Sequence, residues 1–275
     1  MTAGAAAAIL RGLADRGDME VDLGEGALAL AALERPRVPL DRYRAHLAEL
    51  AADVGARAGV DPDLDRQAAA LSDVIAGTHG YQGDVRNYDD LQNANLMRVI
   101  DRRRGLPVAL GILYLHAAQS LGWEATGLAF PAHFVIALAA GQSRAILDPF
   151  HGGVRRGAAE LRRLLKSVAG ENEELGPAHY APVGNRAVLL RLHNNVKLRR
   201  IQGRDVAGAL AAIDAMLLFA PREAGLWHEA GLLNGHLGNL RAAVGALERA
   251  LALAGDATSR HRLAALIQDL RARLN

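Results

Sequence analysis

The 275-residue chain contains no cysteine, so it forms no disulfide and offers no thiol as a nucleophile or metal ligand. Aromatic residues make up only 4% of the sequence. The apolar residues are mostly alanine, leucine and valine, and alanine and leucine are strong helix formers. The sequence therefore predicts closely packed helices without covalent cross-links.

Long hydrophobic runs are also absent. No apolar stretch approaches the roughly 20 residues that a helix needs to cross a bilayer. The first ten residues lack the basic segment of a secretory signal. We therefore expect a cytoplasmic protein with no membrane partner.

The charges of the two signs nearly balance, giving a formal net charge of +2. Arginines gather between residues 98 and 104 and again between residues 155 and 163, but aromatic residues do not alternate with them and acidic residues lie close by. This pattern does not predict nucleic-acid binding, which usually needs a dense basic surface.

The N-terminal part, residues 1–76, shows apolar residues three or four positions apart, as at Leu47, Leu50 and Val54. This spacing predicts a bundle of short amphipathic helices. Pro107 fits the first turn of a later helix, where a missing N–H costs little.

After Gly122 the apolar period changes from about 3.6 residues to about two, which is typical of strands. We expect short antiparallel strands at residues 123–129, 134–139 and 145–147. Residues 77–170 would then form a core of helix and antiparallel sheet. The predicted fold class is α+β, and the polar stretch 170–184 is predicted to be a linker.

The C-terminal stretch, residues 185–275, contains an internal repeat with an offset of 34 residues, which is the period of tetratricopeptide repeats. We predict helical repeats of that type, whose concave surfaces commonly hold peptides. Four small or apolar residues recur at this offset: Ala209, Ala212, Leu217 and Ala220 at Ala243, Ala246, Leu251 and Ala254.

Several short motifs, taken in order, resemble the SirB group of bacterial proteins, in which a transglutaminase-like core precedes tetratricopeptide repeats. The resemblance implies a SirB-type transglutaminase-like domain at residues 1–178 and a repeat region at 185–275. It supplies no defined reaction, but the same core occurs in eukaryotic adaptor proteins, which favours an interaction role. The motifs are Gly80–Gly83, Asn87–Asp90, Asn93, Arg102–Pro107, Phe130–Phe134 and Ile146–Gly153.

The superfamily's thiol enzymes place a thiolate at a helix N-terminus, a histidine on the sheet beside it, and an aspartate or asparagine behind the histidine. The resemblance puts His133 and Asp148 in the last two positions and the nucleophile near residues 107–109. We assign Ala109 as the vacant nucleophile position, where the SirB group is expected to carry serine or threonine. Acyl transfer therefore lacks its attacking atom.

Two interpretations of His133 and Asp148 remain. They either form a structural hydrogen bond between strands, which we favour, or act as a general base that activates water or a substrate hydroxyl. His151 adds a third possible metal ligand, but the separations match no recognised ligand spacing. We predict no metal and no cofactor.

Other candidate residues surround this position. The three arginines Arg102, Arg103 and Arg104 are interpreted either as solvated cations at a helix end or as an anion-binding patch. The residues expected to line the cleft are Asn87, Tyr88, Asn93, Pro107 and His151.

The sequence thus predicts a non-catalytic transglutaminase-like protein that acts as a protein- or peptide-interaction or regulatory module. The alternative is a hydrolase or acyltransferase that uses the His133–Asp148 dyad. The sequence does not specify the oligomeric state.

Overall fold

The computed structural model describes residues 2–274. The first residue of the predicted N-terminal domain and the last residue of the predicted repeat region lie outside them. The chain divides into two compact units, one of residues 2–9 and 16–192 and one of residues 10–15 and 193–274. Within the described range, none of the helices combines the length and the apolar character needed to cross a lipid bilayer.

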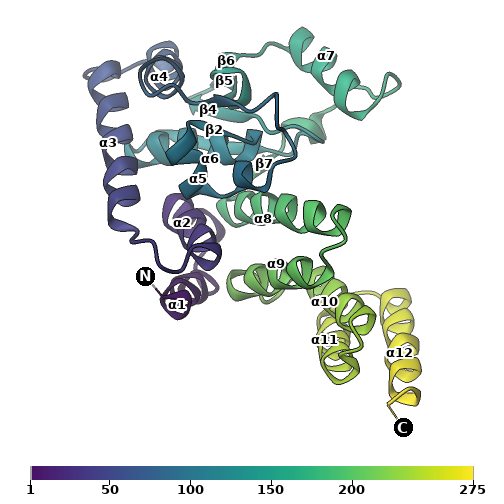
Figure 1. Ribbon diagram of the computed structural model, residues 1–275. Helices are drawn as coiled ribbons and strands as arrows, with labels where there is room; N and C mark the ends of the chain where they lie inside the picture. Colours follow the sequence, from purple (N-terminus) through teal and green to yellow (C-terminus); the bar gives the residue numbers. More distant parts are fainter. Residues whose placement is uncertain (1, 275) are drawn as a thin grey trace. The chain divides into compact units, whose positions relative to one another are not determined.

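Short helices dominate the N-terminal part, as expected from the apolar periodicity (Figure 1). Asp22 and Asp63 begin two of these helices by accepting hydrogen bonds from the backbone N–H groups of Glu25 and Arg66, at 2.9 and 2.8 Å. The helices are α1 (Ala3–Leu13), α2 (Leu23–Glu34), α3 (Asp41–Ala58) and α4 (Leu64–Leu71), and a π-helical segment (Ser72–Thr78) continues α4.

The core helix of the first unit, α6 (Pro107–Ser120), begins at Pro107 as predicted. Its N-cap residue, Leu106, makes no side-chain capping bond. Helix α5 (Leu96–Arg102) precedes it and ends at Arg103, whose φ of 58° is left-handed. Two short parallel strands, β1 (Gln82–Gly83) and β2 (Arg104–Gly105), pair beside these helices.

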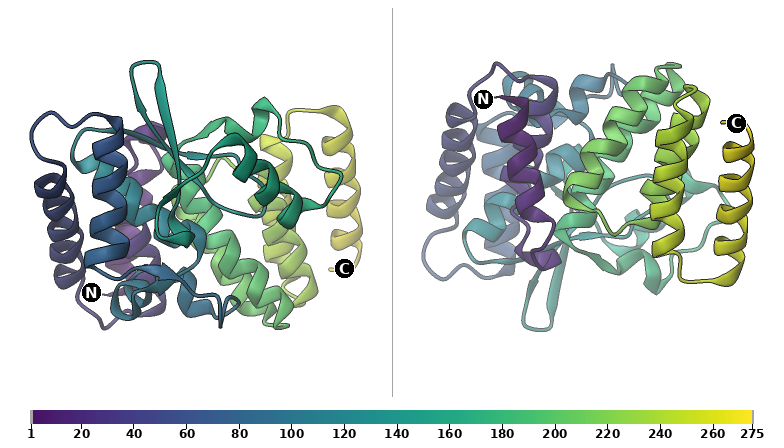
Figure 2. Two further views of the ribbon diagram at one scale, coloured as in Figure 1. Left: turned by 90° about the horizontal axis from the view of Figure 1, so that it is seen from above. Right: turned by 90° about the horizontal axis from the view of Figure 1, so that it is seen from below.

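The predicted antiparallel sheet is present, which confirms the α+β fold class. Its strand order is β6-β5-β4-β3-β7. The last strand lies in the stretch expected to be a linker, and it pairs with β3 at Gly127 and Leu128. The β4–β5 hairpin projects from the sheet in both views of Figure 2. The strands are β3 (Glu124–Leu128), β4 (Ile136–Ala140), β5 (Ser143–Asp148), β6 (Val154–Arg155) and β7 (Pro182–Val183).

Side chains alternate between the two faces of this sheet, and helices pack against both faces. Phe134 and Ile136 face α6, where they lie against Gly111. Val135 and Ala137 point to the other face and join a buried cluster that includes residues of α7 (Ala158–Ala169). The segment that directly follows His133 is therefore held between two packed layers.

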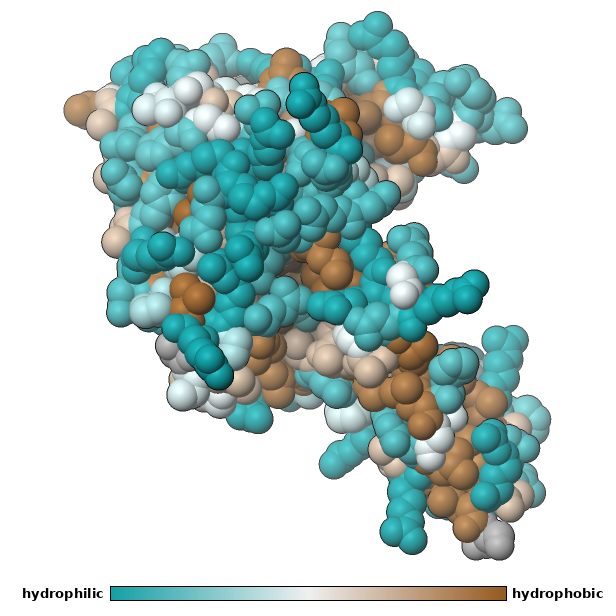
Figure 3. All heavy atoms as spheres, viewed as in Figure 1, coloured by the Kyte–Doolittle hydropathy of each residue, from teal (hydrophilic) through white to brown (hydrophobic). Residues whose placement is uncertain are grey.

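The second unit consists of paired helices with the predicted 34-residue repeat. Helix α8 (Asn185–Gln202) runs from the first unit into the second. Apolar surface gathers over the C-terminal helices in Figure 3, and the exposed large apolar residues of this unit include Leu232, Leu237, Leu253 and Leu266. The repeat helices are α9 (Val206–Phe219), α10 (Ala224–His236), α11 (Leu240–Leu253) and α12 (Ala257–Ala272).

Small residues at the repeated positions let the repeat helices approach closely. Ala209, Ala212, Ala243 and Ala246 are all buried. Gly231 of α10 lies against the side chain of Leu247 in α11, at a distance that leaves no room for a methyl group. The alanine and glycine content of this region is therefore a packing requirement.

Candidate functional site

The two residues predicted as a dyad are in contact. The Nε2 atom of His133 lies 2.9 Å from Oδ1 of Asp148, and both side chains are buried. Among residues 2–274, Asp148 is the only hydrogen-bond partner of the His133 ring. In the neutral tautomer whose Nε2–H donates to Asp148, Nδ1 is an acceptor without a partner among these residues.

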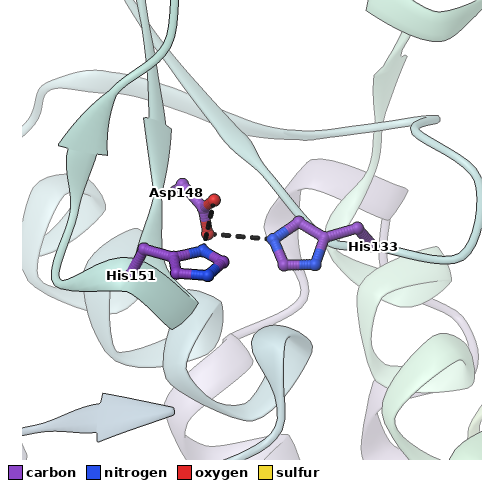
Figure 4. A group of neighbouring side chains, drawn as sticks. All are labelled: His133, Asp148 and His151. Atoms are coloured by element: carbon purple, nitrogen blue, oxygen red, sulfur yellow. Dashed lines mark hydrogen bonds and ion pairs between the residues drawn. The ribbon is translucent and has the colours of Figure 1, made fainter. Parts of the chain in front are cut away.

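Asp148 binds more than His133. Its second oxygen, Oδ2, lies 2.8 Å from Nδ1 of His151 and accepts two hydrogen bonds from the guanidinium of Arg156, at 3.2 and 2.9 Å. Figure 4 shows both imidazole rings turned toward this carboxylate. One buried carboxylate therefore organises two histidines and one arginine.

The protonation of Asp148 follows from these contacts. Burial alone would raise the pKa of the carboxyl. The hydrogen bonds and charges of His133 and His151 outweigh burial and hold the pKa of Asp148 below its ordinary value. Asp148 is therefore ionised at neutral pH.

Aromatic rings surround the dyad. The ring of Phe150 meets the His133 ring edge to face, with centroids 5.9 Å apart, and it meets Tyr88 in the same manner at 5.8 Å. The side chain of His151 is 47% exposed, and Tyr88 is 38% exposed. Of the predicted cleft residues, Tyr88 and His151 are thus both partly exposed, and the rings of both contact Phe150.

The loop before His133 is held in an unusual conformation. Ala132 has a φ of 53°, and the His133 N–H bonds to the Pro131 carbonyl at 2.6 Å, which describes a tight γ-turn. The guanidinium of Arg191 donates hydrogen bonds to the carbonyls of Phe130 and His133. Arg191 thus fixes the backbone on both sides of the turn and is a positioning residue.

The assigned vacant position, Ala109, does not share a helix face with the residues that approach the dyad. Gly111 contacts Phe134, and Tyr114 contacts Gly153 near Asp148. At about 100° per residue, Ala109 lies about 160° from Gly111 around the helix, whereas the angle from Pro107 to Gly111 is about 40°. Helix geometry therefore favours Pro107 over Ala109 as the first-turn residue that faces the sheet.

The loop residues Asn87 and Asn93 belong to a buried polar network. Arg102 donates to Asp84 at 2.9 Å and to the Asn93 side chain at 3.0 Å, and Asn93 donates to the Asn87 carbonyl at 2.7 Å. Asp84 also accepts from the Asn87 N–H at 3.1 Å. Burial opposes ionisation of Asp84, but these hydrogen bonds together lower its pKa. Asn93 is fully buried, so it supports the loop from within.

Two of the three arginines interpreted as solvated cations or as an anion-binding patch form hydrogen bonds within the protein. Arg102 is held by the network above. Arg103 bonds to Tyr81 and to His46 and lies over the Tyr81 ring at 4.7 Å from its centroid. Arg104 is exposed. A positive patch of all three side chains is therefore not present at the surface.

Three residues that organise the site were not singled out from the sequence. Arg156 had been noted only within an arginine cluster, and Arg191 lies far along the chain from His133. The third residue is Tyr114, which is buried within α6. Its hydroxyl is buried without a hydrogen-bond partner in the described part of the chain. Burial, together with the nearby Asp148 charge, raises the pKa of Tyr114 above its ordinary value.

Comparisons with known proteins agree with this architecture. A model of the transglutaminase-like superfamily matches residues 41–194, and a tetratricopeptide-repeat model matches residues 196–268. A UPF0162 protein of Vibrio cholerae is 29% identical over 202 residues, which are 73% of this chain and 74% of that protein. A UPF0162 protein of Pseudomonas aeruginosa is 27% identical over 260 residues, 90% of each chain. Human F-box only protein 21 is 31% identical over 81 residues, 30% of this chain and 13% of that protein.

Proposed function

We propose that this chain, which belongs to the transglutaminase-like superfamily and carries C-terminal tetratricopeptide repeats, is a non-catalytic protein that binds a peptide segment of a partner. The observation that carries the proposal is the composition of the first turn of α6. Leu106, Pro107, Val108 and Ala109 occupy the place where a thiol enzyme of this superfamily presents its nucleophile, and all four are apolar. In this proposal the protein acts in the cytoplasm as an interaction or regulatory module.

The second unit supplies support for peptide binding. A cavity of about 340 Å³ opens between the start of α10 and the α11–α12 turn. Its walls combine Leu253 and Leu263 with the polar side chains of His228, Asp256 and Arg262. A mixed wall of this kind suits a side chain with an apolar body and a polar end.

The experiment has a binding part. Peptides are selected from a displayed random library against the full chain, and their affinities are measured with Arg262→Glu and with Arg249→Glu. Arg262 lines the cavity, and Arg249 is an exposed arginine of α11 outside its lining. We expect Arg262→Glu to weaken binding at least about tenfold and Arg249→Glu to leave it unchanged. Failure to select any peptide that distinguishes the two variants would overturn peptide binding at this cavity.

The experiment also has an activity part. Wild type and His133→Ala are assayed on ester, amide and isopeptide substrates. We expect the two proteins to give equal background rates. A rate in wild type that disappears in His133→Ala would overturn the non-catalytic proposal.

One observation favours a second candidate function, a hydrolase. When His133 is neutral and its Nε2–H donates a hydrogen bond to Asp148, the free electron pair of the ring is on Nδ1. This is the arrangement of a general base that could take a proton from water or a substrate hydroxyl. The same comparison of wild type with His133→Ala decides between the two candidates.

A further inference from the structure

We propose that His133, Asp148 and His151 form a binding site for one divalent transition-metal ion of the zinc type. The three residues each offer one ligand atom, and these atoms all lie within 4.8 Å of one another. Two imidazoles and one carboxylate are a common ligand set for zinc and for iron(II), cobalt(II) or nickel(II). This inference rests on a different observation from the peptide-binding proposal.

The local fold explains why the sequence spacing alone did not indicate this ligand set. Asp148 ends β5, and a single 3-10 turn, Pro149–His151, follows it directly. The turn brings His151 back over Asp148, three residues later in the chain. The three-residue spacing of Asp148 and His151 therefore indicates a shared site only when the 3-10 turn between them is known. His133 reaches the same carboxylate from the loop before β4.

The distances leave room for an ion after a small adjustment. Zinc bonds to nitrogen and oxygen of roughly 2.0–2.2 Å place tetrahedral ligand atoms about 3.3 Å apart. The His133 and His151 nitrogens lie 2.9 and 2.8 Å from the oxygens of Asp148. An entering ion would replace these two hydrogen bonds. His151 is the ligand that can move, because its side chain is 47% exposed while Asp148 is fully buried.

The protons can be accommodated within the rings. In the absence of an ion, each histidine carries its proton on the nitrogen that faces Asp148. Binding requires the proton to move to the other ring nitrogen. In the described chain, neither Nδ1 of His133 nor Nε2 of His151 has a hydrogen-bond partner, so both can take the proton.

Arg156 fits the role of a residue that orients a ligand. Its guanidinium holds Oδ2 of Asp148 at 2.9 Å and leaves Oδ1 to the His133 side. Groups that bond to metal ligands fix their orientation. The positive charge of Arg156 also repels a metal cation, and this repulsion opposes the gain from orienting the ligand.

The test uses tag-free, chelator-treated protein and cobalt(II) chloride as the probe. We expect one bound Co²⁺ per chain with visible absorption, displaced by zinc chloride but not by magnesium chloride, since imidazole ligands favour transition metals. Because the chain has no cysteine, no thiol contributes to this signal. A wild-type protein that retains no Co²⁺ would overturn the proposal.

Variants locate the ion. His151→Ala removes a half-exposed side chain, so the fold is expected to survive, and we expect at least about a tenfold loss of affinity. The matched control is His79→Ala, which removes a histidine that bonds to Asp53 at 2.8 Å and contacts a second histidine, His46. Equal binding by wild type and His151→Ala would refute the assignment and would leave the peptide-binding test untouched.

Discussion

Gly111 of α6 lies so close to the ring of Phe134 that a methyl group on its Cα would be 2.4 Å from the Cε1 atom of that ring. Phe134 follows His133 directly, so this contact sets the distance between the core helix and the loop that carries His133. The observed position of His133 relative to α6 therefore requires a glycine at residue 111.

Gly111→Ala should destabilise the first unit by about 1–3 kcal/mol, because an extra methyl group in a packed core forces its neighbours to shift. The measurement is urea unfolding followed by Trp123 fluorescence in a Trp227→Phe background. Gly77→Ala is the control, since a Cβ at Gly77 would meet no atom within 4 Å. Equal unfolding midpoints in the two variants would contradict the tight contact.

A cysteine placed at residue 107 should become reactive. In Pro107→Cys the thiol would lie at the N-terminus of α6 on the face shared with Gly111, where the helix dipole lowers a thiol pKa. A protonated His133 within reach of that thiol would lower the thiol pKa further. Each unit of lowering raises the thiolate fraction about tenfold at acidic pH. The rate of iodoacetamide labelling at mildly acidic pH measures this effect without background, because the chain has no other cysteine.

Two controls accompany this variant. Ala109→Cys places the thiol on the opposite side of the helix and should label slowly. Adding His133→Ala to Pro107→Cys should slow its labelling. If Ala109→Cys proves the faster of the two, the original assignment of the nucleophile position to Ala109 is correct.

Arg102 and Arg104 offer a matched pair of substitutions. Arg102→Ala leaves the Asp84 carboxylate buried without its ion-pair partner and should cost about 3 kcal/mol of unfolding free energy. Arg104→Ala removes an exposed side chain and should change stability by less than about 0.5 kcal/mol. Thermal unfolding of both variants checks the prediction, and similar losses in the two would argue against the buried network.

The stability of the first unit should fall in mild acid because of His46. Burial, then the charge of Arg103, lowers the pKa of His46; the hydrogen bond that His46 donates to Glu49 opposes this shift, and the electrostatic effect of His79 adds to it. The unfolded chain, with an ordinary histidine pKa of about 6.5, therefore binds a proton more readily than the folded chain does. Stability is then lost as the pH falls below about 6.5 and down to the folded pKa.

The measurement is the urea midpoint at several pH values in wild type and in His46→Gln. The wild type should lose more stability than the variant between neutral and mildly acidic pH. An identical pH dependence in both proteins would show that His46 is not the group responsible.

Tyr114→Phe should stabilise the protein. The Tyr114 hydroxyl is buried without a partner in the described residues, and an unsatisfied buried hydroxyl costs about 1 kcal/mol or more. A higher unfolding midpoint in the variant is the expected result. A lower midpoint would mean that the hydroxyl is hydrogen-bonded, for example through a buried water near Asp148.

Much of the fold could be read from periodicity. The change from a helical to an alternating pattern after Gly122 correctly placed the sheet, and the 34-residue offset correctly indicated the repeats. The strand β7 was missed because its two residues, one of them a proline, carry no alternation, and its pairing with β3 depends on a distant segment. Local patterns identify elements that are several residues long, and short edge strands fall below that limit.

The side chains around the candidate site were harder to foresee. The motif resemblance pointed to His133 and Asp148, and the structure brings them together. The partners Arg156 and Arg191 could not be foreseen, because a long arginine side chain can reach in many directions from its backbone. The resemblance puts the nucleophile position near residues 107–109, and which of these residues faces the sheet depends on rotation about the helix axis.

The sequence by itself determined that this chain has no thiol and that apolar residues occupy the start of its core helix. Those facts are properties of composition, and no packing can change them. Only the tertiary structure decided that one carboxylate, Asp148, is shared by His133, His151 and Arg156. These contacts of Asp148 require the 3-10 turn, the loop before His133 and the packed sheet together. Contacts between distant segments are set by the free energy of the whole fold.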